Sequence, residues 1–160
     1  MRSELRAAER DELEAIGRLY HAVWRETQAS LQPRDVAAYR DEAFFIARVR
    51  NLPAPPLAAY AQGRILGFAA WTQDYLGQLY IAPDGRGSGL GRRLLQASED
   101  AIRAGGFDRA RLLCLVGNHS ARAFYERCGW RVADTITEEA ETRNGPVPVA
   151  CWAMVKELKM

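Results

Sequence analysis

Apolar residues near the start of the chain recur with the spacing of a helix. They sit at i, i+3, i+4 and i+7 from residue 13 onward, as Leu13, Ile16, Leu19, Tyr20 and Val23. Residues 4–8 precede this helix and predict a short first strand, which a charged run ends. Pro33 suits the first turn of another helix, whose apolar side would include Val36, Tyr39 and Phe44.

Short apolar runs replace the helical spacing after the proline-rich stretch 51–56, which cannot remain helical. Glycine at Gly63 supplies a tight turn between the first two runs and so predicts a hairpin. We expect strands at 57–61, 65–72, 76–82, 111–116, 131–137 and 147–156, and helices at 90–104 and 120–127. The loop between the last two strands carries Asn144-Gly145, a second hairpin signal.

The centre of the chain therefore has the order strand, helix, strand. Such a crossover joins parallel strands with a right-handed connection, and ligands bind near the carboxyl ends of those strands. Antiparallel strands flank the crossover on both sides. We predict an α/β fold with a mixed, mostly antiparallel sheet, one parallel β-α-β crossover, and helices on both faces. Residues 1–160 are expected to form one domain.

Composition excludes several classes of protein. The chain of 160 residues is 48% hydrophobic and 26% charged, which is typical of an ordinary globular domain. Its net charge of +2 gives no global reason to expect nucleic-acid binding. No apolar run reaches the roughly 18–20 residues that span a bilayer. The charged N-terminal stretch lacks the apolar core of a secretory signal, so a cytoplasmic protein without membrane contact is expected.

The three cysteines do not predict a metal site. Cys114, Cys128 and Cys151 form no CxxC pair, and only His21 and His119 could join them. Cys114 and Cys151 lie in apolar runs, where a free cysteine usually behaves as a small buried hydrophobic residue. We therefore expect structural roles for these thiols and no bound metal.

A glycine-rich loop lies between the expected strand 76–82 and the expected helix 90–104. Its glycines are Gly85, Gly87, Gly89 and Gly91. Without Cβ atoms the backbone can curl closely around a ligand and point successive N–H groups at one place. The helix N-terminus adds unpaired donors and a partial positive charge. Full charges come from Arg86, Arg92 and Arg93. A pyrophosphate suits this loop, although a turn that merely caps the helix has the same composition.

Two common nucleotide-binding motifs do not match the loop. A Walker loop requires GxxxxGK[ST], and the sequence has no lysine between Met1 and Val155. A dinucleotide fingerprint that begins at Gly87 would need glycine where Arg92 stands.

The pattern that does match is RxxGxG, formed by Arg86, Gly89 and Gly91. In this motif the sequence resembles the GCN5-related N-acetyltransferase superfamily, where the loop holds the pyrophosphate of acetyl-CoA. Residues 118–130 resemble the family's second signature, an asparagine before a helix that bears Phe-Tyr-Glu and then Gly-aromatic. The order of helices and strands agrees with the family from about residue 4 to 158. The resemblance implies this family's fold and an acetyl-CoA-dependent N-acetyltransferase.

The resemblance also implies a set of cofactor-binding residues. Backbone N–H groups of the loop would hold the pyrophosphate, and the adjoining strand end and second helix would hold the pantetheine arm. The residues concerned are Ile81, Ala82, Arg86, Gly87, Ser88, Gly89, Leu90, Gly91, Arg92, Asn118, Ala121 and Phe124. A backbone N–H near Ile81 would polarise the thioester carbonyl in a gap between the two parallel strands. Asn118 has a second interpretation as a helix cap.

Tyr125 is the candidate general acid. Loss of coenzyme A leaves a thiolate, and a nearby phenol can donate a proton to it, as the family's tyrosine at this place is thought to do. The spacing of residues 121, 124, 125 and 128 equally fits an apolar helix face, so Tyr125 could instead belong to the core. Asp74 is the expected general base, with His21 and Glu26 as outside candidates. A solvated turn aspartate is the other interpretation of Asp74.

The acceptor amine is expected to lie between the first two helices and the strand around Trp71. Its pocket would draw on Trp24, Gln28, Tyr39 and Phe45, each of which could also be packing. The favoured function is transfer of an acetyl group from acetyl-CoA to a primary amine of a small molecule or peptide by direct attack. A non-catalytic acyl-CoA-binding or sensing module on the same fold is the alternative. No nucleic-acid partner is expected, and by analogy with the family a homodimer is possible.

Overall fold

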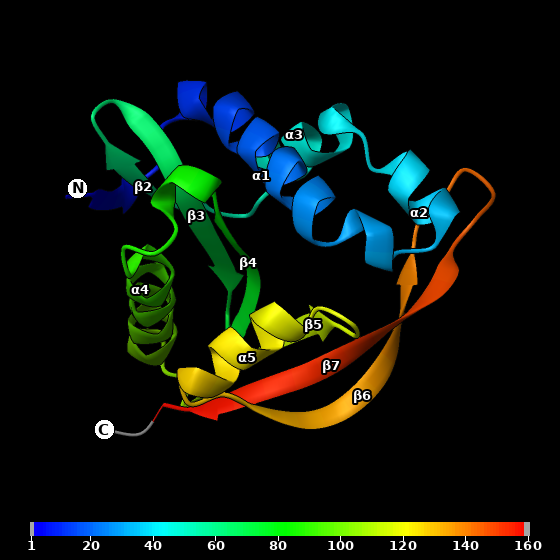
Figure 1. Ribbon diagram of the computed structural model, residues 1–160. Coiled ribbons are helices and arrows are strands. Elements are labelled where there is room, and N and C mark those ends of the chain that lie inside the picture. Colours follow the sequence, from blue (N-terminus) through cyan, green and yellow to red (C-terminus); the bar gives the residue numbers. More distant parts are fainter. Residues whose placement is uncertain (1, 159–160) are drawn as a thin grey trace.

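Seven strands form one sheet in the computed structural model, which describes residues 2–158 (Figure 1). Their order across the sheet is β1-β2-β3-β4-β5-β7-β6. The strands are β1 (Glu4–Ala7), β2 (Leu57–Ala61), β3 (Arg64–Thr72), β4 (Tyr75–Ile81), β5 (Arg109–Leu115), β6 (Arg131–Ala140) and β7 (Val147–Glu157). Only β4 and β5 are parallel neighbours, and the other neighbouring pairs are antiparallel. The predicted mixed sheet with one parallel crossover is confirmed.

Helices cover both faces of the sheet. They are α1 (Leu13–Thr27), α2 (Arg34–Tyr39), α3 (Glu42–Arg50), α4 (Leu90–Ala104) and α5 (His119–Arg127). Three short 3-10 turns, η1 (Arg10–Glu12), η2 (Ala29–Leu31) and η3 (Pro83–Gly85), precede or follow them. None of the helices in the described part of the chain is long and apolar enough to cross a membrane.

The second expected helix is divided in two, so the prediction of one helix from Pro33 to Phe44 was wrong. Arg40 adopts a non-helical conformation with φ −90° and ψ 73°. Asp41 then caps a new helix, because its carboxylate accepts a hydrogen bond of 2.9 Å from the backbone N–H of Phe44. The break turns α3 back against α1.

Alternation along β3 divides the apolar core between the two faces of the sheet. Ala69 belongs to the cluster that packs under α4, and Phe68 belongs to the cluster under α1 and α3. Figure 1 shows α1 and α3 on one side of strands β2–β4 and α4 on the other. Tyr20 and Phe45, both buried, fill the second cluster from α1 and α3.

The parallel strands β4 and β5 separate along their length. They pair only where Tyr75 faces Arg111, at the start of β4. On its other edge β5 pairs with β7 over its whole length, from Arg109 to Leu115, so beyond Arg111 it has a partner on that edge only. The carboxyl ends of β4 and β5 are therefore left apart, and a gap opens in the middle of the sheet.

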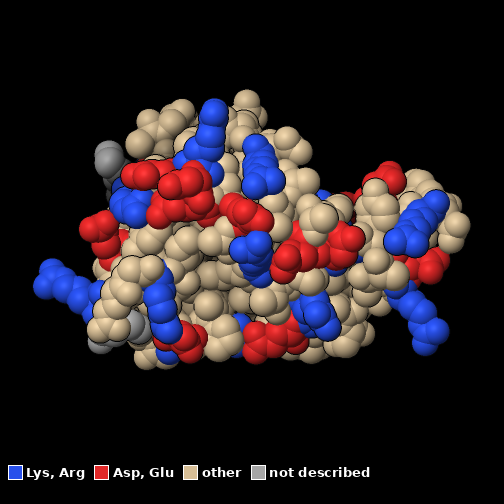
Figure 2. Space-filling model, turned by 90° about the horizontal axis from the view of Figure 1, so that it is seen from above, with Lys and Arg blue, Asp and Glu red and all other residues tan. Residues whose placement is uncertain are grey.

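Charges of both signs share the face that lies at the top of Figure 1. In Figure 2 this face shows basic and acidic side chains interspersed, with no continuous basic stripe. A nucleic-acid backbone is usually bound by such a stripe. This face therefore gives no indication of a nucleic-acid-binding surface.

Candidate active site

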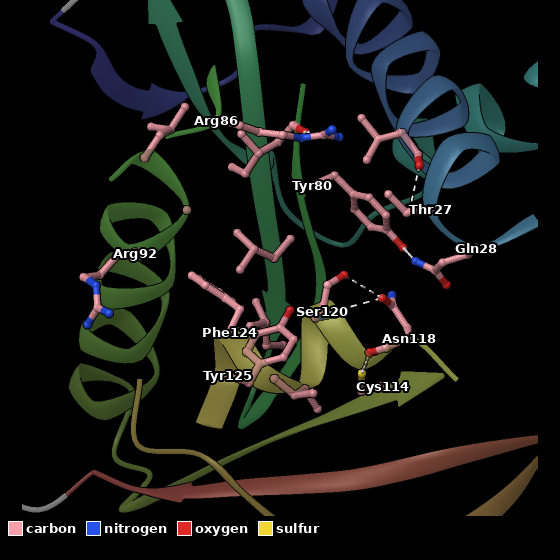
Figure 3. Close-up of a pocket in the computed structure, with 18 of the residues that line it drawn as sticks. Thr27, Gln28, Tyr80, Arg86, Arg92, Cys114, Asn118, Ser120, Phe124 and Tyr125 are labelled. Carbon is pink, nitrogen blue, oxygen red and sulfur yellow. Dashed lines mark hydrogen bonds between the residues drawn. The ribbon is translucent and has the colours of Figure 1, made fainter. Parts of the chain in front are cut away.

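A cavity of about 560 Å³ occupies the gap between β4 and β5 (Figure 3). The glycine loop and the start of α4 line one end, α5 lines a side, and the last turn of α1 lines the remaining wall. Eleven of the predicted site residues line it, namely Ile81, Arg86, Gly87, Gly89, Leu90, Gly91, Arg92, Asn118, Ala121, Phe124 and Tyr125. The structure thus brings the two sequence motifs together around one space.

The glycine loop keeps its backbone open toward the cavity. Gly87 and Gly89 have φ values of +75° and +80°, a region that side chains other than glycine rarely adopt. A Cβ added at either position would meet nothing within 4 Å. Gly89 is the N-cap of α4, so the first N–H groups of that helix have no intrahelical acceptor. This end of the cavity can receive an anion.

Arg86 directs its side chain away from the loop and toward α1. Its guanidinium makes two hydrogen bonds of 2.8 Å to the carboxylate of Glu26, and two more, of 3.2 and 3.1 Å, to the carbonyl oxygen of Ile81. The hydrogen bond with Glu26 raises the pKa of Arg86, and the same bond lowers the pKa of Glu26. Glu26 is therefore the partner of Arg86 in this structure.

The edge of β4 that faces the gap presents its backbone groups at alternate residues. The N–H of Ala82 donates to Leu66 at 2.8 Å and its carbonyl accepts from Gly85 at 2.9 Å, so Ala82 pairs inward. Because these groups alternate along a strand, those of Leu79 and Ile81 face the gap instead. The N–H of Ile81 fits the expected pairing with a ligand arm, whereas its carbonyl accepts from Arg86. Ala82 does not fit this pairing, because both of its groups are already bonded.

Tyr125 points its hydroxyl into the cavity from α5, as Figure 3 shows. No described residue makes a hydrogen bond to this hydroxyl, and burial raises the pKa of Tyr125 above its ordinary value. Its ring also packs edge-on against Phe124 and Trp130, with centroids 5.3 and 6.0 Å away. The two interpretations of Tyr125 are therefore compatible, since the ring belongs to the core and the hydroxyl to the cavity.

Asn118 caps α5 rather than reaching across the cavity. Its side-chain oxygen accepts from the N–H of Ala121 at 3.4 Å and from the hydroxyl of Ser120 at the same distance. Ser120 was not predicted but lines the cavity beside it. The only signal for Ser120 in the sequence was its place two residues after the motif asparagine.

Cys114 is buried in the wall of the cavity, on β5. Burial raises the pKa of its thiol to about 11. At neutral pH this cysteine is a thiol rather than a thiolate, and the thiolate is the nucleophilic form. Its structural role, expected from the sequence, agrees with this environment. Among residues 2–158 no group of three His, Cys, Asp or Glu side chains is placed to hold a metal ion.

Several expected residues do not line the cavity. Asp74 precedes β4 at the end opposite Ile81, and its carboxylate forms an ion pair of 3.0 Å with Arg111. Ser88 turns its hydroxyl back to the carbonyl of Gly85 at 2.7 Å. Four residues of the expected acceptor pocket are instead packed in or against the core, namely Trp24, Tyr39, Phe45 and Trp71.

Gln28, the C-cap of α1, and Tyr80, on β4, meet at the α1 side of the cavity. The side-chain amide of Gln28 donates a hydrogen bond of 3.1 Å to the hydroxyl of Tyr80 (Figure 3). Burial raises the pKa of Tyr80 well above its ordinary value, so this hydroxyl stays protonated. The sequence did not place Tyr80 in the cavity, because alternation along a strand does not reveal which face meets a gap.

Comparison with known proteins identifies the fold and the family. The model of the acetyltransferase (GNAT) family matches residues 16–130. An L-methionine sulfoximine/L-methionine sulfone acetyltransferase of Pseudomonas paraeruginosa is 29% identical over 126 residues, which are 73% of this chain and 69% of that protein. A mycothiol acetyltransferase of Rhodococcus opacus is 33% identical over 121 residues, 67% of this chain and 37% of that protein.

Solved structures share the whole fold at lower identity. A GCN5-related N-acetyltransferase from Rhodopseudomonas palustris superposes with a TM-score of 0.78 at 23% identity, covering 98% of this chain and 96% of that one. The PaiA N-acetyltransferase from Thermoplasma acidophilum, solved with coenzyme A, gives 0.72 at 22% identity and covers 98% and 99%. The family resemblance seen in the two motifs is confirmed, and this chain belongs to the acetyltransferase (GNAT) family.

Proposed function

We propose that this protein transfers an acetyl group from acetyl-CoA to a primary amine of a small molecule or peptide by direct attack. One observation carries the proposal. A single cavity joins the open glycine loop to the hydroxyl of Tyr125 through the gap between β4 and β5. An anion-binding end and a proton donor in one continuous space are what transfer from a coenzyme A thioester requires.

The residues present fit coenzyme A. Gly87 and Gly89 leave open space where a Cβ would stand, so a pyrophosphate can approach the N–H groups at the start of α4. Arg92 adds positive charge beside them. The backbone groups of Leu79 and the N–H of Ile81 offer hydrogen bonds to an extended arm along β4, while the carbonyl of Ile81 accepts from Arg86. Acetyl-CoA would supply an activated acyl group at the inner end of this space.

Tyr125 is proposed as the acid. Its hydroxyl remains protonated because burial raises its pKa, and it has no hydrogen-bond partner of its own among the described residues. It is therefore free to donate to a thiolate that forms inside the cavity. Cys114 is unsuited to carry the acyl group, because burial raises the pKa of its thiol.

No carboxylate stands among the described residues that line the cavity. Asp74, the expected base, is held by Arg111 outside it. The acceptor amine, whose ordinary pKa is near about 10, would then lose its proton to solvent before it attacks. We expect kcat/KM to rise with pH toward the pKa of the amine.

The lack of a carboxylate among the described residues that line the cavity also favours a second candidate, a module that binds acyl-CoA without turnover. Such a module would need the glycine loop but not the hydroxyl of Tyr125. The two candidates share the fold and the cofactor end of the cavity, and they differ in catalysis.

Calorimetric titration with acetyl-CoA, with ATP and NADH as controls, tests the cofactor, and turnover with an amine panel and a free-thiol readout tests catalysis. We expect selective binding of acetyl-CoA. Tyr125→Phe should leave this affinity unchanged and lower kcat about 100-fold, as for loss of a general acid. Tyr75→Phe is the matched control, since Tyr75 is also shielded from water with a raised pKa but does not line the cavity.

Each outcome has a separate meaning. A folded protein that ignores acetyl-CoA would end the proposal. Binding without turnover of any amine would favour the sensing module. Full activity of Tyr125→Phe at every pH would remove the acid role but leave the transferase.

A further inference from the structure

Two arginines beside the α1 side of the cavity form no ion pair with a described carboxylate. Arg40 follows α2, Arg48 lies on α3, and both are half-buried. Neither guanidinium forms an ion pair with a carboxylate of residues 2–158. Arg48 has one weak contact, 3.5 Å from its Nη1 to the hydroxyl of Tyr20. Glu138 on β6 is the acid that acts on Arg40 electrostatically, without an ion pair between them.

Aromatic rings surround these two charges. The guanidinium of Arg40 lies 5.5 Å from the ring centroid of Trp24 and 5.3 Å from that of Phe44. Arg48 lies 4.7 Å from the same Phe44 ring, so one ring lies within reach of both cations. Buried Trp24 also keeps its indole N–H without an acceptor.

The surroundings of Arg40 disfavour its charge. Burial lowers the pKa of Arg40, and the neighbouring charge of Arg48 lowers it further, whereas Tyr20, Tyr80 and Glu138 act in the opposite direction. Two like charges partly removed from water are costly unless an anion joins them. A ligand anion would relieve this cost.

Neither arginine lines the cavity, but both interact electrostatically with Tyr80, which does. Arg48 contacts the hydroxyl of Tyr20, and the Tyr20 ring packs on the Tyr80 ring with centroids 4.5 Å apart. Tyr80 and Gln28 line the cavity directly. Figure 1 shows α2 and α4 at opposite sides of the molecule, so these arginines are remote from the pyrophosphate loop. The anion that they suit therefore belongs to the acceptor.

We propose that Arg40 and Arg48 bind a carboxylate of the acceptor, which makes the acceptor a free amino acid or a similarly small amine that bears a carboxylate. A guanidinium matches a carboxylate through two parallel hydrogen bonds, which a carboxamide cannot reproduce with the same charge. The amino group of the same molecule would then face the gap between β4 and β5. The inference rests on the proposed function and specifies the class of amine.

The test compares acids with their amides. The twenty common L-amino acids and L-methionine sulfone are each assayed with acetyl-CoA beside the corresponding carboxamide, with release of free thiol as the readout. We expect kcat/KM for the best acid to exceed that of its carboxamide about 100-fold, as for one lost charged hydrogen-bonding pair. Arg40→Gln should lower kcat/KM for the acid by about the same factor. It should change kcat/KM for the carboxamide less than about threefold.

Variants on the same helices separate recognition from folding. Arg34→Gln removes an exposed cation from the start of α2 and should change neither value. Arg48→Gln provides a second disruption should Arg40→Gln fail to fold, and it should act in the same direction. Arg40→Lys keeps the charge but not the two parallel N–H donors of the guanidinium, so an intermediate loss of kcat/KM for the acid is expected.

Three results would overturn the inference. One is equal use of acids and carboxamides, another is unchanged preference in both folded arginine variants, and the third is binding of acetyl-CoA without acetylation of any acid in the panel. In the first two cases turnover persists, so the proposed transferase stands. Failure to bind acetyl-CoA at all would instead remove the proposed function, and this inference with it.

Discussion

The two walls of the cavity use different parts of the chain. The wall proposed to bind the cofactor (the cofactor wall) is the glycine loop 85–91 with the start of α4, and it offers backbone N–H groups. The proposed acceptor wall is the α1 side of the cavity with Gln28, together with α2 and α3 behind it, where Arg40 and Arg48 lie outside the cavity lining. Backbone groups are the same in every protein, whereas side chains differ between relatives. The cofactor wall therefore suits a shared ligand, and the acceptor wall is where this chain can differ from the rest of its family.

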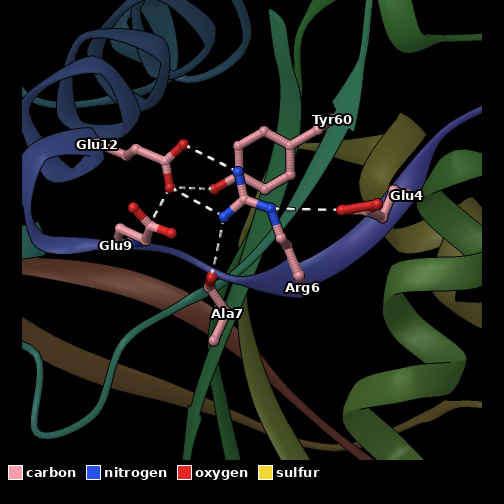
Figure 4. A network of polar contacts seen from close by, with 6 residues as sticks. All are labelled: Glu4, Arg6, Ala7, Glu9, Glu12 and Tyr60. Carbon is pink, nitrogen blue, oxygen red and sulfur yellow. Dashed lines mark hydrogen bonds and ion pairs between the residues drawn. The ribbon is translucent and has the colours of Figure 1, made fainter. Parts of the chain in front are cut away.

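A polar network attaches each wall to the sheet, and the two networks differ in how deeply they are buried. The carboxylate of Glu99, on α4, is 4% exposed and accepts from Trp130 Nε1 at 3.0 Å and from Lys156 Nζ at 2.7 Å. At the start of α1, the carboxylate of Glu12 accepts from Arg6 near the surface (Figure 4). Removing one member of a buried ion pair costs the folded state more stability than removing one member of a surface pair. A substitution in the network of the cofactor wall should therefore destabilise the protein more than one in the network of the acceptor wall.

The largest effect is expected at the cofactor wall, for Gly89→Glu. The change forces a side chain into φ +80°, places it where a ligand would lie, and adds a negative charge at an anion site. We expect the Kd for acetyl-CoA to rise by about 1000-fold, or about 4 kcal/mol, in calorimetric titration.

Gly63→Glu is the matched control for backbone strain. Gly63 has φ +75°, open space around it, and a place in the turn between β2 and β3 outside the cavity. This variant should lose comparable stability and keep its affinity. Equal affinities of the two variants would mean that the loop is only a helix cap.

The cofactor wall could be predicted from the sequence because its geometry depends on residue type. Gly87 and Gly89 adopt φ values of +75° and +80°, which residues other than glycine rarely do, so the glycine spacing itself indicates the loop. Tyr125 followed from its motif. Its double role, with the ring in the core and the hydroxyl in the cavity, required the position of α5 against the sheet.

The acceptor wall could not be predicted in the same way. Arg40 and Arg48 lie near the same Phe44 ring because the chain turns at Asp41, where the apolar spacing had predicted a continuous helix. Asp74 was expected near the chemistry, but its partner Arg111 is 37 residues further along the chain and occupies its carboxylate outside the cavity. Contacts between distant residues of this kind leave no local signal in one sequence.

The second largest effect is expected for Glu99→Gln, which tests the attachment of the cofactor wall. The neutral amide would leave Lys156, half-buried at 24% side-chain exposure, without its carboxylate. We expect a loss of about 2–3 kcal/mol in the free energy of unfolding, or roughly 4–12 °C in Tm. Urea denaturation and thermal melting would measure it.

Asp100→Asn is the control on the same helix. Asp100 is exposed and pairs at 3.1 Å with Arg103 within α4, so its loss should cost less than about 0.5 kcal/mol. Acetyl-CoA affinity should survive in both variants well below Tm, because Glu99 lies turns away from Gly89. A stability of Glu99→Gln equal to that of Asp100→Asn would show that burial does not distinguish the two networks.

The smallest effect is expected at the attachment of the acceptor wall. The pKa of Glu12 falls from an ordinary value near 4.5 to about 2, chiefly because Arg6 hydrogen-bonds its carboxylate, with the backbone N–H of Glu9 adding to this. The hydroxyl of Tyr60 donates a further bond of 2.8 Å (Figure 4). Since the pKa of Glu12 is depressed in the folded state, its contribution is complete above pH 4.5 and is lost as pH falls toward 2.

Glu12→Gln should therefore lower the free energy of unfolding by less than about 1 kcal/mol at pH 7 and flatten its dependence on pH between about 5 and 2. Urea titrations across this range would show the two curves converging at low pH. Glu14→Gln, which removes an exposed carboxylate paired with Arg18 at 2.8 Å, is the control and should follow the wild-type slope. Parallel curves for wild type and Glu12→Gln would mean that Arg6 and Tyr60 do not hold α1 through this carboxylate. A loss at pH 7 as large as that of Glu99→Gln would contradict the ranking of the two walls.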